Sequence, residues 1–171
     1  MRKTEPKVKR SAYTLVEVLI VVTIIGIASA VIVPRMLAAG TLGIQAAARM
    51  VIADMLIAQN EAIAKQETRK VIFDAATNSY RVTTAGGTTI TAPWRTGSQS
   101  GLFVVDFDTD DRFGGVALEN VDFGGGQELV FDALGAPTSG GQVELVFRNQ
   151  RYRISVSEFT GKVTIQQIDG G

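Results

Sequence analysis

Residues 12–33 read AYTLVEVLIVVTIIGIASAVIV, an apolar run with one carboxylate near its start. Leu15 to Val33 would form roughly 28 Å of helix at 1.5 Å per residue, which is enough to cross the hydrocarbon core of a bilayer. Glu17 lies inside this run. Because a charge near the middle of a spanning helix costs roughly 2.5–3.5 kcal/mol, we expect Glu17 to have a function and a cationic partner.

This segment resembles the class III signal of type IV pilins and type II secretion pseudopilins. In that family a prepilin peptidase cuts before the aromatic residue, and the new amine is usually methylated. The resemblance implies a cut between Ala12 and Tyr13, although Ala12 replaces the family's usual glycine. It implies that Glu17 neutralises the N-terminal amine of a neighbouring subunit, a pairing that makes a buried carboxylate tolerable. Thr14 and Pro34 complete the expected assembly residues.

Two other interpretations compete for the same segment. An ordinary secretory signal would end at the small-residue site Ala28-Ser29-Ala30. Glu17 interrupts its hydrophobic region, however, and apolar residues continue beyond that site. A plain uncleaved anchor would need only the length and hydropathy of the run. The position of the motif, the glutamate, the apolar run and Pro34 together favour the prepilin signal.

Charge and composition predict orientation and exclude several classes of protein. The chain has 171 residues and a net charge of zero. Five basic residues against one acidic residue give residues 1–12 a charge of +4, which leaves −4 for the remainder. The basic leader should stay in the cytoplasm of a bacterial cell, which places the C-terminus in the periplasm. An acidic mature chain argues against non-specific nucleic-acid binding, which needs a cationic surface to displace counterions. The absence of cysteine means that the exported part has no disulfide.

We expect an α+β fold of three segments: a leader (1–12), an N-terminal helix (13–66, with 13–33 in the membrane) and a β-rich domain (67–171). Apolar residues recur every three or four positions in the second half of the helix, which predicts one buried stripe. The stripe is formed by Ile44, Ala48, Val51, Met55, Ala58 and Ala62. Pro34, Gly40 and Gly43 predict a kinked or partly melted region between the membrane and this stripe.

From Arg69 onward the hydrophobic period changes to two, which predicts antiparallel strands that follow the long helix in the sequence. Thr77-Asn78 is expected to turn the first hairpin. Residues 108–127 are expected to be irregular. The remaining strands are expected at 88–91, 102–107, 128–131, 143–147, 152–156 and 162–168. The stretch around Leu56–Ala62, the first hairpin and the C-terminal strands resemble the GspH/FimT branch of minor pseudopilins and pilins.

Catalysis is not expected, because without Cys or His the common triads and zinc sites are unavailable. No cofactor is expected. Asp106, Asp108 and Asp110, with Asp111 beside them, offer a weak calcium hypothesis, but the EF-hand spacing fails. A solvated acidic loop is the simpler interpretation.

A second weak hypothesis concerns a basic hairpin tip. Arg148, Arg151 and Arg153 flank Tyr152, and arginines beside an aromatic suit single-stranded DNA. Alternation along an exposed strand explains Arg151 and Arg153 equally well. Nucleic-acid binding is therefore kept as an alternative.

The sequence predicts a minor pseudopilin-like structural subunit of a type II secretion system. Such a subunit is anchored in the inner membrane by one helix and is drawn into a periplasmic filament. Its implied partners are other pilin or pseudopilin subunits, the prepilin peptidase, the assembly platform and membrane lipid. The alternatives are a FimT-like minor pilin for adhesion or DNA uptake, and a membrane-anchored binding domain without a filament role.

Overall fold

The computed structural model describes residues 13–94 and 101–169, with only the backbone described for residues 31 and 33–41. Helix α1 runs from Leu15 to Lys65, and the chain divides into two units at Ala38 and Ala39. The helix continues without interruption past Pro34 and Gly40, so the expected partial melting is wrong for this structure. Alanine, leucine and methionine dominate the flanking positions, and these strong helix formers propagate the helix past one missing hydrogen bond.

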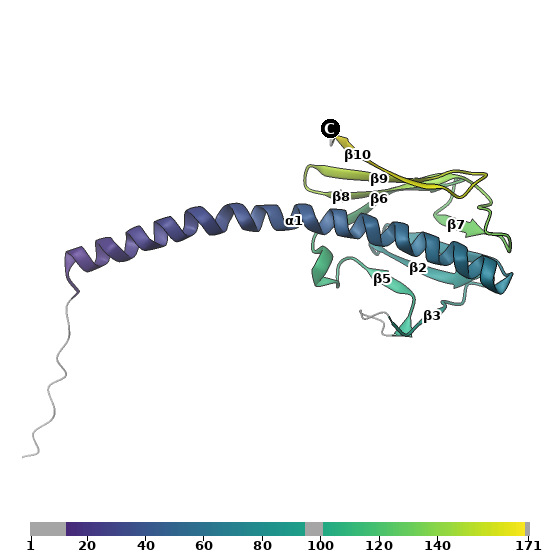
Figure 1. The fold of residues 1–171 in the computed structure, drawn as a ribbon, viewed down its shortest axis with the longest axis horizontal. Helices are drawn as coiled ribbons and strands as arrows, with labels where there is room; N and C mark the ends of the chain where they lie inside the picture. Colours follow the sequence, from purple (N-terminus) through teal and green to yellow (C-terminus); the bar gives the residue numbers. More distant parts are fainter. Residues whose placement is uncertain (1–12, 95–100, 170–171) are drawn as a thin grey trace, which may run out of the picture. The chain divides into compact units, whose positions relative to one another are not determined.

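The second unit contains two four-stranded antiparallel sheets (Figure 1). The first sheet has the order β5-β2-β1-β7 and the second has the order β10-β9-β8-β6. A pair of two-residue strands, β3 and β4, lies apart from both sheets. The strands span Arg69–Asp74 (β1), Ser79–Thr84 (β2), Thr91–Ala92 (β3), Gly101–Leu102 (β4), Val104–Asp106 (β5), Ala117–Phe123 (β6), Glu128–Phe131 (β7), Gly141–Phe147 (β8), Gln150–Val156 (β9) and Val163–Asp169 (β10).

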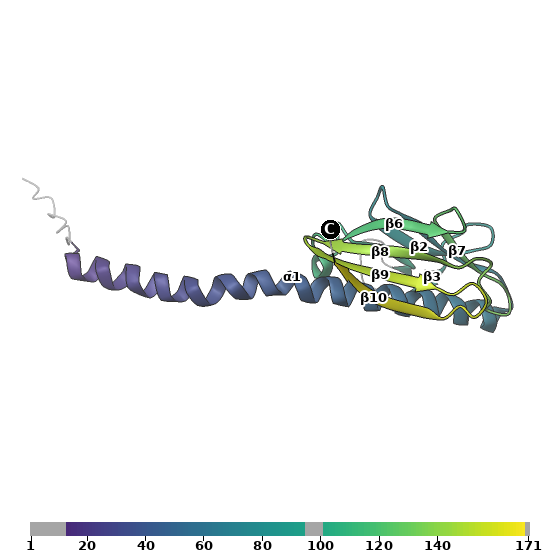
Figure 2. The same cartoon turned by 90° about the horizontal axis from the view of Figure 1, so that it is seen from above.

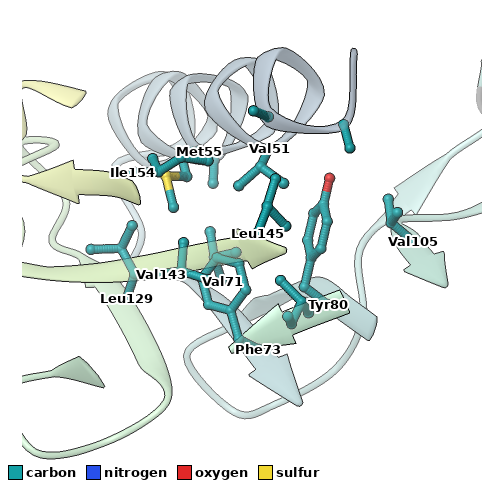
Figure 3. Close-up of a cluster of buried hydrophobic side chains, with 14 of the residues drawn as sticks. Val51, Met55, Val71, Phe73, Tyr80, Val105, Leu129, Val143, Leu145 and Ile154 are labelled. Carbon is teal, nitrogen blue, oxygen red and sulfur yellow. The ribbon is translucent and has the colours of Figure 1, made fainter. Parts of the chain in front are cut away.

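The predicted stripe of α1 is the helical side of the core. All six of its residues are fully buried, as is Ala47 between them. Figure 3 shows Val51 and Met55 facing side chains from both sheets. The residues that meet the helix there include Val71, Phe73, Tyr80, Leu129, Val143, Leu145 and Ile154. An α+β fold with its helix packed on antiparallel sheets is therefore confirmed.

Local signals explain most of the strand boundaries. Asp74 turns the first hairpin, because its Oδ1 accepts hydrogen bonds from the backbone N–H groups of Ala76 and Thr77. The hairpin joins Asp74 to Ser79 in register, as expected. The end of α1 is held by Gln59, whose Nε2 donates to the carbonyl of Gly135 at 2.8 Å. Gly161 has a positive φ of 63°, and an added Cβ there would lie 2.6 Å from Gln59 Nε2.

The expectation that residues 108–127 are irregular is wrong, because β6 occupies Ala117–Phe123. The register of β6 against β8 shifts between Glu119 and Asp122, and Asn120 has a positive φ of 45°. This bulge breaks the alternation of buried and exposed residues on which the prediction relied. The expected strand at 102–107 is also divided, since β4 ends at Leu102 and β5 begins at Val104.

One buried carboxylate was not expected. Asp54 lies on the buried side of α1 with a relative exposure of 2%. The hydroxyl of Tyr80, on β2, donates a short hydrogen bond to its Oδ2. In Figure 3 the Tyr80 hydroxyl points toward the helix. Burial of an unsatisfied carboxylate is costly, so this bond helps to fix the position of the helix on the first sheet.

Candidate anchoring and assembly site

Thr14 lies immediately before α1 and caps its first turn. The backbone N–H of Glu17 donates to Thr14 Oγ1 at 3.2 Å, and that of Val18 donates to the Thr14 carbonyl at 3.2 Å. The Thr14 hydroxyl thereby satisfies the N–H of Glu17, which would otherwise lack a helical partner, whereas the bond from Val18 is the first regular bond of the helix. The spacing Thr14-x-x-Glu17 is that of a capping box. This local role for Thr14 could have been found from the sequence by that spacing.

Glu17 is an exposed residue of this first turn. The aligned peptide dipoles make the N-terminal end of a helix positive, so a carboxylate there is stabilised. Glu17 forms no ion pair with the residues that the structure describes. A cation from outside the described chain would neutralise this carboxylate.

The large apolar side chains of the first unit lie exposed around the helix. Twelve of these side chains, between Tyr13 and Ile32, have relative exposures from 49% to 80%. Thr23 adapts to such surroundings, because its Oγ1 donates to the carbonyl of Leu19 at 2.7 Å. A hydroxyl satisfied within its own helix can enter an apolar medium at little cost. The surface from Tyr13 to Ala30 therefore suits lipid or a bundle of apolar helices.

Hydropathy alone points to a different part of the same helix. Within the described residues, Leu42–Lys65 is the one stretch that is long and apolar enough to cross a membrane, and 39% of its most apolar window is buried. Leu15–Ala30 forms a shorter apolar helix. Because Leu42–Lys65 supplies the buried stripe of the core, we assign the anchoring surface to the exposed Leu15–Ala30 stretch.

The other expected site residues of the N-terminal segment have mixed positions. Ala12 lies outside the described residues, and Tyr13 is the first described residue and is exposed. Pro34 lies within the backbone of α1, and its side chain is outside the description. Cleavage and methylation at Ala12 and Tyr13 and the assembly roles of Thr14, Glu17 and Pro34 stay predictions.

Two of the three arginines in the β8–β9 hairpin are engaged by one carboxylate. Glu144 is 1% exposed and lies opposite Arg153 in the register of β8 and β9. Arg151 contacts Glu144 at 2.6 Å, and Arg153 contacts it at 2.7 Å. Arg151 also pairs with Glu119 at 3.0 Å. Asn120 donates a hydrogen bond to Glu144 at 2.7 Å.

This network neutralises Glu144 and occupies the arginines. Burial acts to raise the pKa of Glu144, but hydrogen bonds from Asn120, Arg151 and Arg153 outweigh it and hold the pKa below its ordinary value. Arg148, in the turn, lies over the ring of Phe147 at 5.1 Å. The structure therefore gives Arg151 and Arg153 a partner within their own sheet, which the sequence did not reveal because Glu144 approaches them only through strand pairing.

The acidic cluster is committed to local hydrogen bonds. Asp106 Oδ1 accepts from the backbone N–H groups of Asp108 and Thr109. Asp108 accepts from Asn78 Nδ2 at 2.7 Å, and Asp110 forms an ion pair with Arg112. Across the described part of the chain, no group of three acidic residues is arranged to hold a metal ion. The calcium hypothesis at Asp106, Asp108 and Asp110 is therefore not supported by this geometry.

Comparison with known proteins finds a known motif in the same N-terminal segment. Residues 7–33 match the prokaryotic N-terminal methylation motif. No curated protein matches the sequence. Two crystal forms of the type IV minor pilin FimU of Pseudomonas aeruginosa share the fold. One has a TM-score of 0.51 at 15% identity, covering 71% of this chain and 91% of FimU. The other has a TM-score of 0.52 at 17% identity, covering 72% and 87%.

The minor pseudopilin EpsH of Vibrio cholerae, from its type 2 secretion system, is also similar. Its TM-score is 0.48 at 15% identity, covering 74% of this chain and 97% of EpsH. The chain therefore combines a methylation motif at the head of an apolar helix with a fold that is similar to that of the minor pilin FimU. These two findings support a relationship to the type IV pilins and pseudopilins.

Proposed function

We propose that this chain is a minor subunit of a periplasmic filament, made as a precursor and cut between Ala12 and Tyr13. The mature chain, 13–171, is held in the bacterial inner membrane by residues 13–33 and then transferred into the filament. The carrying observation is that a methylation motif opens a helix whose apolar side chains are exposed around its circumference.

Glu17 supports this proposal through its position rather than its contacts. It is the only acidic residue between Tyr13 and Pro34 and stands in the first helical turn. After cleavage, the amine of Tyr13 in an adjacent subunit would supply the cation that Glu17 lacks among the described residues. Pairing in a low dielectric would also select one register between neighbouring helices, since a shifted helix leaves both charges buried and unpaired. Prepilin peptidase, the assembly platform and membrane lipid are the further partners that this route requires.

Within the pilin class we propose the pseudopilus of a type II secretion system, where the subunit helps to start or cap the filament that exports folded proteins. The second candidate is a type IV minor pilin, favoured by the fold shared with FimU. A DNA-uptake role has less support, because Arg151 and Arg153 are paired with Glu144. Deleting the chain and measuring protein secretion and pilus-dependent motility separates the two machines: loss of secretion alone supports the pseudopilus, and loss of motility alone contradicts it.

Processing is tested by mass spectrometry of the N-terminal peptide from native membranes. We expect the peptide to begin at Tyr13 with a methylated amine. A start at Val31 would indicate a secreted domain, and an intact Met1 would indicate a plain anchor; either result contradicts the filament proposal.

Assembly is tested by comparing Glu17→Gln, which removes the charge, with Thr23→Val, a conservative change elsewhere in the same helix. Glu17→Gln should remain in the membrane but enter sheared filaments poorly, whereas Thr23→Val should assemble normally. Equal assembly of Glu17→Gln and the unchanged chain would remove the proposed pairing with a neighbouring amine.

A further inference from the structure

The two large sheets of the second unit have four edge strands, and three of them carry features that discourage pairing. β5 has only three residues and β7 has four. β6 has seven residues, but it carries a bulge between Glu119 and Asp122 and exposes both of those acidic side chains. Short length, bulges and charges are the usual means by which proteins protect sheet edges.

The fourth edge strand, β10, has none of these protections. It spans seven residues with the sequence VTIQQID, and its only charge is at Asp169. It pairs with β9 in an unbroken register from Val163 to Asp169. Thr164 to Gln167 are all exposed although they point alternately to opposite faces, so both faces of this strand remain accessible in the described part of the chain. Figure 2 shows β10 as the outermost strand of its sheet.

An open groove runs between this strand and α1. Its volume is about 320 Å³, and it is lined by Gln45, Arg49, Tyr152, Ile165 and Gln167. The floor is organised by hydrogen bonds from Gln45 Nε2 to Tyr152 Oη at 3.3 Å and from Tyr152 Oη to Gln167 Oε1 at 3.1 Å. Ile165 and Gln167 lie opposite Ile154 and Tyr152 in the strand register, so they project from the face that packs toward the helix.

We propose that β10 is a docking edge that receives an extended segment of a partner protein as an additional antiparallel or parallel strand. The exposed backbone row recognises the extended main chain, and alternate side chains of the incoming strand enter the groove beside α1. Arg49 is exposed in this groove and forms no ion pair within the described part of the chain. The favoured segment therefore carries a carboxylate at a position that faces Arg49.

This inference does not depend on filament assembly, because it concerns only the second unit and its edge. A second copy pairing through its own β10 is the main competing occupant. The chain contains no cysteine, so a single introduced cysteine reports this alternative without background. Gln166, at the centre of β10, would face its own counterpart in an antiparallel self-pairing that uses the whole strand.

The direct test measures binding of short blocked peptides to the full chain in detergent micelles by fluorescence polarisation. The first peptide alternates valine and threonine around one central glutamate, and the second has lysine in place of glutamate. A third repeats the first with alternate amides N-methylated, which removes backbone donors. We expect the glutamate peptide to bind at least tenfold more tightly than the N-methylated one. Its advantage over the lysine peptide should be roughly fivefold and should shrink at high salt.

Arg49→Glu should reverse the preference between the glutamate and lysine peptides. Lys65→Glu, the same charge change at an exposed position outside the groove, should leave that preference unaltered. Absence of glutamate-peptide binding, equal binding of the N-methylated peptide, or an unchanged preference in Arg49→Glu would overturn the proposal. So would efficient disulfide-linked dimers of Gln166→Cys, since they would show that a second copy occupies the edge.

Discussion

The two units of this chain differ in the burial of their apolar side chains and in the pairing of their carboxylates. In the first unit, apolar side chains from Tyr13 to Ile32 are exposed, and Glu17 has no cation among the described residues. In the second unit, the stripe of α1 is fully buried, and the buried carboxylate Glu144 has two arginine partners. The first unit therefore depends on surroundings that other molecules supply, whereas the second satisfies its own groups.

The largest expected effect tests the difference in apolar burial between the two units. Met55→Ala should destabilise the folded domain by about 2–5 kcal/mol, because it leaves a cavity in place of a fully buried side chain. Leu19→Ala, a similar truncation in the exposed half of the helix, should leave domain unfolding nearly unchanged. Urea unfolding of the full chain in detergent, followed by the single Trp94, measures both. Equal losses for the two variants would contradict the division between the units.

The next effect tests the surroundings of the first unit. Ile24→Arg should weaken membrane insertion by roughly 2.5–3.5 kcal/mol, because it places a second charge within the apolar helix. Membrane fractionation should show a larger soluble or degraded pool, while the second unit keeps its unfolding midpoint. As a control, Ile24→Leu should fractionate like the unchanged chain. Normal insertion of Ile24→Arg would argue against residues 13–33 as the anchor.

A smaller effect concerns the paired carboxylate. Glu144→Gln should cost about 1–3 kcal/mol, because its arginine bonds lose their charge while Asn120 keeps a possible partner. The pKa of Glu144 is lowered in the folded chain, so its stabilising contribution is present above its ordinary value of 4.5. The contribution is lost as pH falls below that value and through the folded-state pKa.

The pH dependence can be isolated by comparing acid unfolding of Glu144→Gln with that of Glu128→Gln. Glu128 forms an exposed pair with Lys70 and serves as a matched control. Glu144→Gln should flatten the fall in stability below pH 4.5 more than Glu128→Gln does. If the two variants show the same acid profile, the network around Glu144 does not control stability in this range.

The smallest effect lies at the helix start. Thr14→Ala should weaken the first turn of α1 by about 0.5–2 kcal/mol, because it removes the oxygen that accepts from Glu17. Amide exchange of Glu17 in micelles should accelerate, and Thr14→Ser should restore slow exchange. The unfolding of the second unit should be unaffected. Unchanged exchange in Thr14→Ala would show that the cap does not protect this turn.

Local patterns in the sequence predicted much of this molecule. The spacing from Ile44 to Ala62 predicted the buried face of α1, and period-two segments predicted most of the later strands. β6 escaped prediction because the bulge at Asn120 interrupts the alternation on which a strand is recognised. Asp54 escaped because it lies beside the apolar stripe and its partner, Tyr80, is supplied by a distant strand.

The sequence by itself determined the apolar N-terminal segment with its single glutamate, the amphipathic helix and the order of helix before strands. These features depend on neighbouring residues, whose spacing along the chain is set by backbone geometry. Only the tertiary structure decided that Glu144 engages Arg151 and Arg153 and that β10 is left as an open edge. Those outcomes depend on which strands pair and in what register, and pairing joins residues whose separation in sequence carries no local signal.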